Sequence, residues 1–247
     1  MIKLQTLPAA PAGHCPPVRR AWRYLVATQD SVDGLLDSFN QVRTLALKAK
    51  VEARGRLSSD ELDLLRAALV FTSSGLDACC HQLVRDALPA LIARGGTAEL
   101  KFREHLRNEL YSPKPPDGLL EAIAAADPRR ELIERYVMAK TKASFQGSGD
   151  LQERVRDTLG ITNKALAKGR FTALDGFFIA RNDIVHRLDY ENPTSASVKR
   201  HHRNPNDVAT ECDTVLALVA DLIHATAELL KRKAGGGQAT TRRDSQG

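Results

Sequence analysis

Apolar residues recur at helical spacing over long stretches of this chain, and this periodicity constrains its fold more than any other feature. One stripe runs from Trp22 to Val42, a second from Leu62 to Ala87 and a third from Val208 to Leu230. Alternation with a period of two does not persist, and no repeat of roughly 20–50 residues is present. The pattern therefore predicts an all-α fold.

Turn and capping residues indicate where the helices begin and end. The first long helix should end before Arg54-Gly55. Ser58 and Glu61 form a capping-box pattern that opens the second, and Pro89 with Gly95-Gly96 should close it. The small residues Ser73, Ser74 and Gly75 in its middle would let another helix approach closely. Further helices are expected near 98–110, 118–126, 129–144, 149–158, 171–188 and 206–233.

These segments predict one domain with two extensions. Residues 1–20, rich in proline, should form a flexible N-terminal arm, and residues 234–247 a disordered tail. Residues 21–233 should form a single helical bundle of four principal helices. Within it, residues 97–165 are expected to be an inserted segment of short helices.

Composition restricts the class of protein. No apolar run approaches the roughly 18 residues that cross a bilayer, and the N-terminus has no signal-peptide core, so we expect a cytoplasmic protein without membrane contact. The four cysteines have the spacing of neither a disulfide framework nor a zinc site, and Cys79-Cys80 should be buried as small apolar residues.

The charge of the chain is concentrated at its ends. The net charge is +6, but residues 1–23 and 231–247 each carry +4, which leaves the middle at −2. A strong positive charge favours nucleic acid as a partner. Because the body is not basic, any attraction to phosphate must be local.

The segment FTALDGFFIARNDIVHRLDY, residues 171–190, carries the most informative pattern. Arg181 lies near the centre of its apolar stripe, which is formed by Leu174, Phe177, Phe178, Ile184, Val185 and Leu188. Burying an unpaired arginine is costly. Arg181 is therefore expected either in a buried ion pair with an acid from another helix or in a functional site.

A second face of the same helix would carry Ile179, Asn182 and His186. Asn182 and His186 are four residues apart, so their side chains can touch. A lone helical histidine is usually a surface or core residue. The combination of Arg181, Asn182 and His186 is what favours a functional interpretation.

Residues Arg181-Asn182-Asp183-Ile184-Val185-His186 match the R-N-x-x-x-H signature of HEPN domains (higher eukaryote and prokaryote nucleotide-binding). The segment ALVFTSSGLDACCHQLVRDAL also resembles the second long helix of the bacterial RiboL-PSP-HEPN subgroup. The resemblance covers roughly residues 22–232 and is most specific over 60–92 and 171–188. It implies a HEPN-type helical bundle in which the motif lies on a core helix.

The resemblance further implies an endoribonuclease that needs neither metal nor cofactor. His186 would be the general base on the ribose 2′-hydroxyl, Arg181 would stabilise the charge on phosphorus, and Asn182 would orient His186 or the phosphate. The product would carry a 2′,3′-cyclic phosphate. The family implies a homodimer with a composite site, acting as a toxin or anti-phage effector beside an antitoxin or defence-system partner.

Two neighbouring features qualify this expectation. Relatives regulated by a nucleotidyltransferase carry tyrosine two residues after the motif histidine, whereas this chain has Leu188 there and Tyr190 nearby. Six basic residues in and after the helix are candidates to bind RNA phosphates, or else form a solvated loop. They are Arg187, Lys199, Arg200, His201, His202 and Arg203.

Two other functions remain open at the level of sequence. The chain could be a non-catalytic HEPN module that binds nucleotides or a protein, or a helical scaffold in which Arg181 forms a buried ion pair. Aromatic residues make up only 5% of the chain, so base stacking should be slight, and Trp22 is expected in the core.

Overall fold

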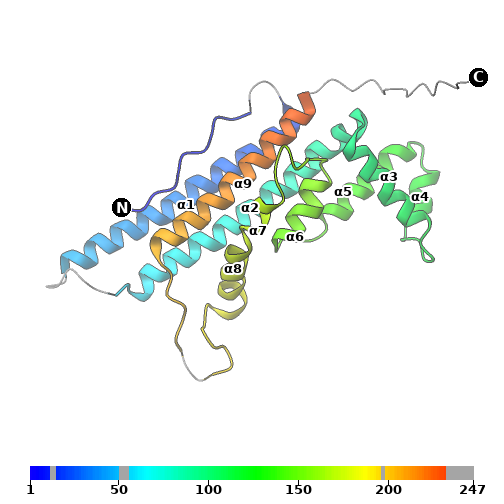
Figure 1. The fold of residues 1–247 in the computed structure, drawn as a ribbon. Coiled ribbons are helices and arrows are strands. Elements are labelled where there is room, and N and C mark those ends of the chain that lie inside the picture. The colour runs from blue at the N-terminus through cyan, green and yellow to red at the C-terminus, as the bar shows by residue number, and fades with distance from the viewer. Residues whose placement is uncertain (12–14, 50–55, 196–197, 232–247) are drawn as a thin grey trace, which may run out of the picture.

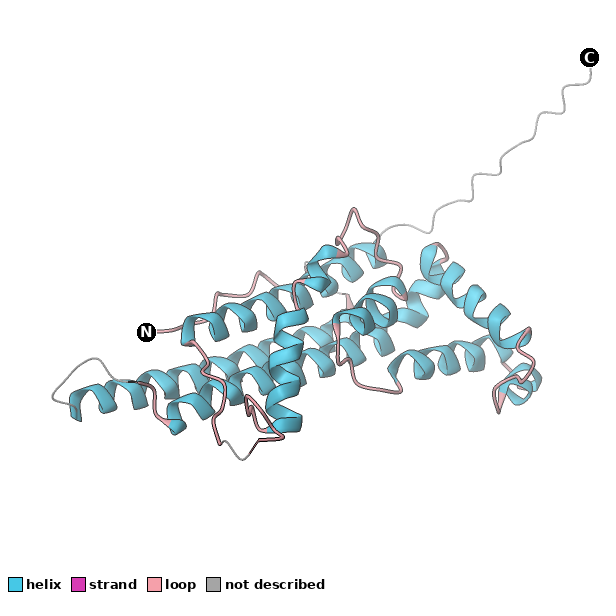
Figure 2. Cartoon of the chain, turned by 60° about the horizontal axis from the view of Figure 1, so that its bottom comes forward, coloured by secondary structure: helices cyan, strands magenta, loops and turns pink. Residues whose placement is uncertain are grey.

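Three long helices form the body of the protein. In the computed structural model, which describes residues 1–11, 15–49, 56–195 and 198–231, they are α1 (Pro16–Ala49), α2 (Ser59–Arg94) and α9 (Pro205–Lys231). Figure 1 shows them running alongside one another, with α2 in contact with both of the others. All regular elements of the described residues are helices, as Figure 2 shows, which confirms the all-α prediction.

The apolar stripes of the sequence form the shared core of these three helices. The eight residues of the α9 stripe are all buried, namely Val208, Cys212, Val215, Val219, Leu222, Ile223, Ala227 and Leu230. Helix α1 begins earlier than its stripe predicted, since Pro16 starts the helix and Val18 and Ala21 are already buried. Trp22 is half-buried against the core, with its ring 5.5 Å from that of His224.

The start of α2 is the predicted capping box. The Ser58 hydroxyl accepts from the Glu61 N–H at 3.2 Å, and the Glu61 carboxylate accepts from the Ser58 N–H at 2.6 Å. The helix continues through Pro89 and ends at Gly95, where φ is 84°. The prediction that Pro89 helps to close it was wrong, because Leu88 and Ile92 on either side are buried and hold the turn in place.

Close packing of α1 on α2 depends on a glycine. A Cβ placed on Gly75 would lie 2.1 Å from Cγ2 of Thr28, a buried residue of α1. Only glycine allows this approach of the two backbones. The expectation that small residues in α2 admit a neighbouring helix is confirmed.

The predicted insert forms a lobe of short helices at one end of the body (Figure 1). It contains α3 (Thr97–Leu110), α4 (Leu119–Ala124), α5 (Pro128–Thr141), α6 (Ser148–Asp150) and a π-helical segment, η1 (Leu151–Asp157). A short turn, α7 (Gly169–Thr172), then leads into α8 (Asp175–Arg187), which projects from the side of the body.

The N-terminal residues are extended but not free. Residues 1–11, which we call the N-terminal strap, lie along α1 and α9 and are held by hydrogen bonds to Asn40, Asp33 and Asp213. This differs from the flexible arm that the prolines suggested. The predicted tail, residues 234–247, and the predicted break at Arg54-Gly55 lie outside the described residues.

The cysteines Cys79 and Cys80 are buried, as the sequence predicted. Cys79, Cys80 and Cys212 are buried as free thiols, and burial raises the pKa of Cys79 and of Cys212 to about 12. None of the helices in the described ranges is long and apolar enough to cross a bilayer.

Candidate active site

Helix α8 packs against the core mainly through its first half. Leu174, Phe177, Phe178 and Ala180 are buried, whereas Val185 is 42% exposed and Leu188 63% exposed. The predicted apolar face is covered as far as Ile184, which packs partly against the core, and the prediction was wrong for Val185 and Leu188. The helix contacts α2 and projects from the side of the body, and residues 185–188 at its end are exposed (Figure 1).

Arg181 lies where α8 leaves the core. Its side chain is half-buried, and its Nη1 donates to the Asn182 side-chain oxygen at 2.9 Å. Its Nε is buried and has no hydrogen-bond partner among the described residues. No carboxylate of the described residues lies within ion-pair distance of its guanidinium. The buried ion pair considered from the sequence is thus not formed.

His186 is exposed on the last turn of α8. Within the part of the chain that the structure describes, it makes no hydrogen bond, whereas the side-chain oxygen of Asn182 is used by Arg181. Helical geometry separates Arg181 from His186 by about 140° around the axis and about 7.5 Å along it. The two side chains therefore leave one helix in different directions.

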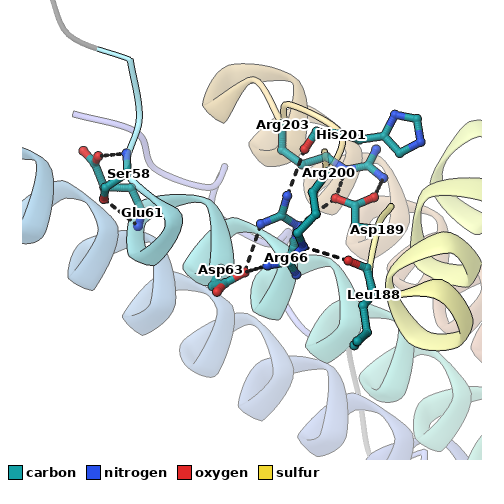
Figure 3. A network of polar contacts seen from close by, with 9 residues as sticks. All are labelled: Ser58, Glu61, Asp63, Arg66, Leu188, Asp189, Arg200, His201 and Arg203. Atoms are coloured by element: carbon teal, nitrogen blue, oxygen red, sulfur yellow. Dashed lines mark hydrogen bonds and ion pairs between the residues drawn. The ribbon is translucent and has the colours of Figure 1, made fainter. Parts of the chain in front are cut away.

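A buried carboxylate lies directly after the motif helix. Asp189 is 0% exposed and accepts hydrogen bonds from Arg66 of α2, at 2.7 Å, and from Arg203 (Figure 3). Arg66 is itself 4% exposed and also binds the His201 carbonyl and Asp63, each at 2.9 Å. We call Asp63, Arg66, Asp189, Arg200 and Arg203 the clasp.

The clasp determines how α8 ends. Leu188 and Asp189 have φ of 51° and 64°, in the left-handed region that side chains other than glycine rarely adopt. The Asp189 N–H donates back to the Asp183 carbonyl at 2.9 Å, and Arg200 Nε donates to the Leu188 carbonyl at 2.7 Å. These bonds hold the strained turn two to three residues beyond His186.

The six predicted phosphate-binding residues have varied surroundings. Arg200 pairs with Asp63 and Arg203 with Asp189, so both connect the loop to α2 or to the end of α8. Lys199 pairs with Glu191 at 2.8 Å, and Arg187 pairs with Asp183 at 3.5 Å. The two remaining residues are His201, whose backbone joins the clasp, and the exposed His202.

Sequence reasoning missed the acidic half of the clasp. Asp63 lies at the start of α2, and Asp189 directly follows the motif in the segment R-L-D-Y. Arg66 and Asp189 are 123 residues apart, and no local pattern connects them. A signal was nonetheless present, because an acid next to a basic loop suggests that the loop's cations have internal partners.

The described residues contain no group of three or more histidine, cysteine, aspartate or glutamate side chains that could hold a metal ion. We compared the chain with protein-family models, with curated proteins and with solved structures. None of them matches.

Proposed function

We propose that this chain is a metal-independent endoribonuclease of the HEPN type, with His186 as general base, Arg181 as the group that stabilises charge on phosphorus and Asn182 as a positioning residue. The observation that carries the proposal is the state of Arg181. Its guanidinium is half-buried and has no carboxylate partner among the described residues, and none of them accepts a hydrogen bond from its Nε. An arginine kept in this state is suited to receive an anion.

The chemistry follows from the two side-chain types. A histidine that is open to solvent can take the proton of a ribose 2′-hydroxyl at neutral pH. The 2′-oxygen then attacks phosphorus, and the 5′-oxygen leaves and is protonated, which yields a 2′,3′-cyclic phosphate. The planar N–H groups of Arg181 would bind the phosphate oxygens while negative charge accumulates on them.

A second copy of the chain would complete this site. Because Arg181 and His186 diverge on one helix, two α8 helices facing each other could bring the arginine of one and the histidine of the other to the same phosphate. Ile179, on the His186 side of α8, is 63% exposed, and a partner helix would cover it. We therefore propose a homodimer as the active form.

The second candidate is a non-catalytic module that binds a nucleotide or a protein through the same residues. The solvent-exposed position of His186 favours it, because no hydrogen bond within the described residues of one copy orients the imidazole. Both candidates use the free N–H groups of Arg181. They differ in the ligand that is bound and in whether it is cut.

The deciding experiment is incubation of mixed cellular RNA with the purified protein in EDTA. We expect fragments with 2′,3′-cyclic phosphate ends from the wild type and none from His186→Ala or Arg181→Lys. His105→Ala is the matched control, since it removes a histidine of α3, outside the motif helix and the loop that follows it, and should leave cleavage unchanged. RNA binding without cleavage by the wild type would support the second candidate.

The biological role that we propose, a toxin or anti-phage effector, has its own test. Expression of the wild type in bacteria should stop growth, and His186→Ala should relieve that arrest at equal protein levels. Equal toxicity of the two proteins would contradict this role.

A further inference from the structure

The N-terminal strap lies in a groove formed by α1 and α9. In Figure 1 it runs along the edge of the body opposite to the one from which α8 projects. Its side chains alternate in exposure: Ile2 and Leu4 pack partly against the core, whereas Lys3 and Gln5 face solvent. Leu7 is a third anchor further along. The strap thus binds like an extended peptide on a receptor surface.

Groove side chains bind the backbone of the strap. Asn40 of α1 accepts from the Ile2 N–H at 3.0 Å and donates to the Ile2 carbonyl at 2.8 Å. Gln29, also of α1, donates to the Gln5 carbonyl at 2.6 Å, and Asp213 of α9 accepts from the Gln5 N–H at 2.8 Å. Both walls of the groove therefore contact one strap.

The charges of the strap and of the groove are complementary. The groove carries Asp33, which accepts from the Leu4 N–H at 3.4 Å, and Asp213 on the opposite wall. The strap residues include Lys3 and no acid. Burial raises the pKa of Asp33 and of Asp213. The nearby Asp37 and Asp30 add to the rise at Asp33, while Lys3 opposes it. A groove with this charge favours an occupant without acidic side chains.

None of these contacts requires the strap and the groove to belong to one molecule. The hydrogen bonds join residues at least 24 positions apart in the chain. The strap forms no ladder with another segment, so it can detach without unfolding the helices beneath it. Exchange of an identical element between copies is a low-cost route to association.

We propose that the α1/α9 groove is a docking site for the N-terminal strap of a second copy of this chain, which replaces the groove's own strap through the same contacts. The local strap has the advantage of a high effective concentration, on the order of millimolar. Exchange in the wild type should therefore need a high protein concentration. The competition is removed when one copy carries a weakened groove and the other copy a weakened strap. The strap of the first copy is then free to bind the open groove of the second.

The test uses two full-length variants. The groove variant, Asn40→Ala with Asp213→Ala, keeps a strap that its own groove holds poorly. The strap variant, Ile2→Asp with Leu4→Asp, keeps an open groove. We expect the fluorescently labelled groove variant to bind the strap variant at least tenfold more tightly than it binds its own unlabelled form, measured by fluorescence anisotropy.

The comparison separates this contact from any dimer formed through α8, which both titrations contain equally. Ile179→Glu on both chains should leave the tenfold difference unchanged, so the result does not depend on the proposed function. A synthetic peptide of residues 1–11 should displace the labelled chain. Equal binding in the two titrations, or no displacement by the peptide, would overturn the proposal.

Helix content from circular dichroism establishes that each variant is folded. Should the aspartate substitutions prevent folding, Ile2→Ser with Leu4→Ser weakens the same two anchors with less perturbation, and the same outcomes apply.

Discussion

Asp189 and Arg181 are both charged side chains removed at least partly from solvent, but only Asp189 has partners of opposite charge in the described structure. Asp189 is fully buried between Arg66 and Arg203, with its oxygens satisfied by charge-assisted hydrogen bonds. Arg181 is half-buried, with a neutral amide as its only partner in the described structure. A paired charge of this kind stabilises the turn after α8, whereas an unpaired one stays available for a ligand.

Removing the buried carboxylate should be strongly destabilising. Asp189→Ala leaves Arg66 without its buried partner, so we expect a loss of about 3–5 kcal/mol in the free energy of unfolding. Asp183→Ala is the matched control, because Asp183 pairs with the exposed Arg187 and should cost only about 0–1 kcal/mol. Urea denaturation followed by circular dichroism measures both, and similar losses would refute the distinction.

Removing Arg181 should have little effect on stability. Since no described carboxylate depends on it, Arg181→Ala should change the free energy of unfolding by roughly 1 kcal/mol or less. Arg66→Ala, which leaves the buried Asp189 with Arg203 as its remaining charged partner, should cost several times more. A large loss for Arg181→Ala in thermal or urea unfolding would instead assign this arginine a structural role.

At the scale of elements, the contact between α1 and α2 depends on backbone proximity rather than on large side chains. Gly75 lies against Thr28, and the buried hydroxyl of Thr28 donates to the Tyr24 carbonyl within its own helix. The polar group is thereby satisfied without a partner from α2. Two long helices can then approach at a point where any Cβ would force them apart.

Two glycine substitutions should have opposite effects. Gly75→Ala places a methyl group 2.1 Å from Thr28 Cγ2 and should destabilise the protein by about 1–3 kcal/mol through overpacking. Gly34 is an exposed position of α1, and a Cβ placed there would have no neighbouring atom within 4 Å. Gly34→Ala should therefore stabilise the protein by about 0.5–1 kcal/mol. Differential scanning calorimetry of the two variants gives the comparison, and shifts of the same sign would contradict it.

The capping box of α2 should make stability depend on pH. Burial alone would raise the pKa of Glu61, but hydrogen bonds from Ser58 and the ion pair with Arg43 outweigh it and lower that pKa below 4.5. The carboxylate therefore contributes stability that is complete above pH 4.5 and is lost as the pH falls through the lowered pKa. The stability difference between wild type and Glu61→Gln, from urea titrations, should shrink below pH 4.5. A constant difference would exclude this linkage.

At the scale of the whole molecule, the body of three long helices carries two projecting parts, the lobe and α8, and the N-terminal strap packs on its surface. The lobe of α3 to η1 extends from one end of α2, α8 leaves the side, and the strap closes the α1/α9 groove (Figure 1). The continuous core lies mostly under α1, α2 and α9. The accessibility of side chains buried in that body therefore reports whether the fold is intact.

Thiol reactivity should report on the intact body. Burial raises the pKa of Cys79 and Cys212 to about 12 and that of Cys80 well above its ordinary value, while Cys15 is half-exposed. We expect one thiol of the four to react rapidly with Ellman's reagent in native protein, and all four in denaturant. Rapid reaction of a second thiol would show that the body opens.

Local patterns of the sequence determined the helices and most of their limits. The capping box, the stripe of α9 and the small residues around Gly75 were all predicted correctly. Such features depend on residues within a few positions of one another, where periodicity and capping chemistry act directly. The motif Arg181, Asn182 and His186 is likewise local and was visible in the sequence.

Only the tertiary structure decided which charges are paired and which faces are covered. It showed that Arg203 binds a buried carboxylate, that Arg181 binds none in the described residues, and that the last turns of α8 leave the core. It also placed the strap in the α1/α9 groove, through bonds that include one between Gln5 and Asp213, 208 residues away. The free energy of such contacts comes from partners brought together by folding, and no spacing along the chain encodes them.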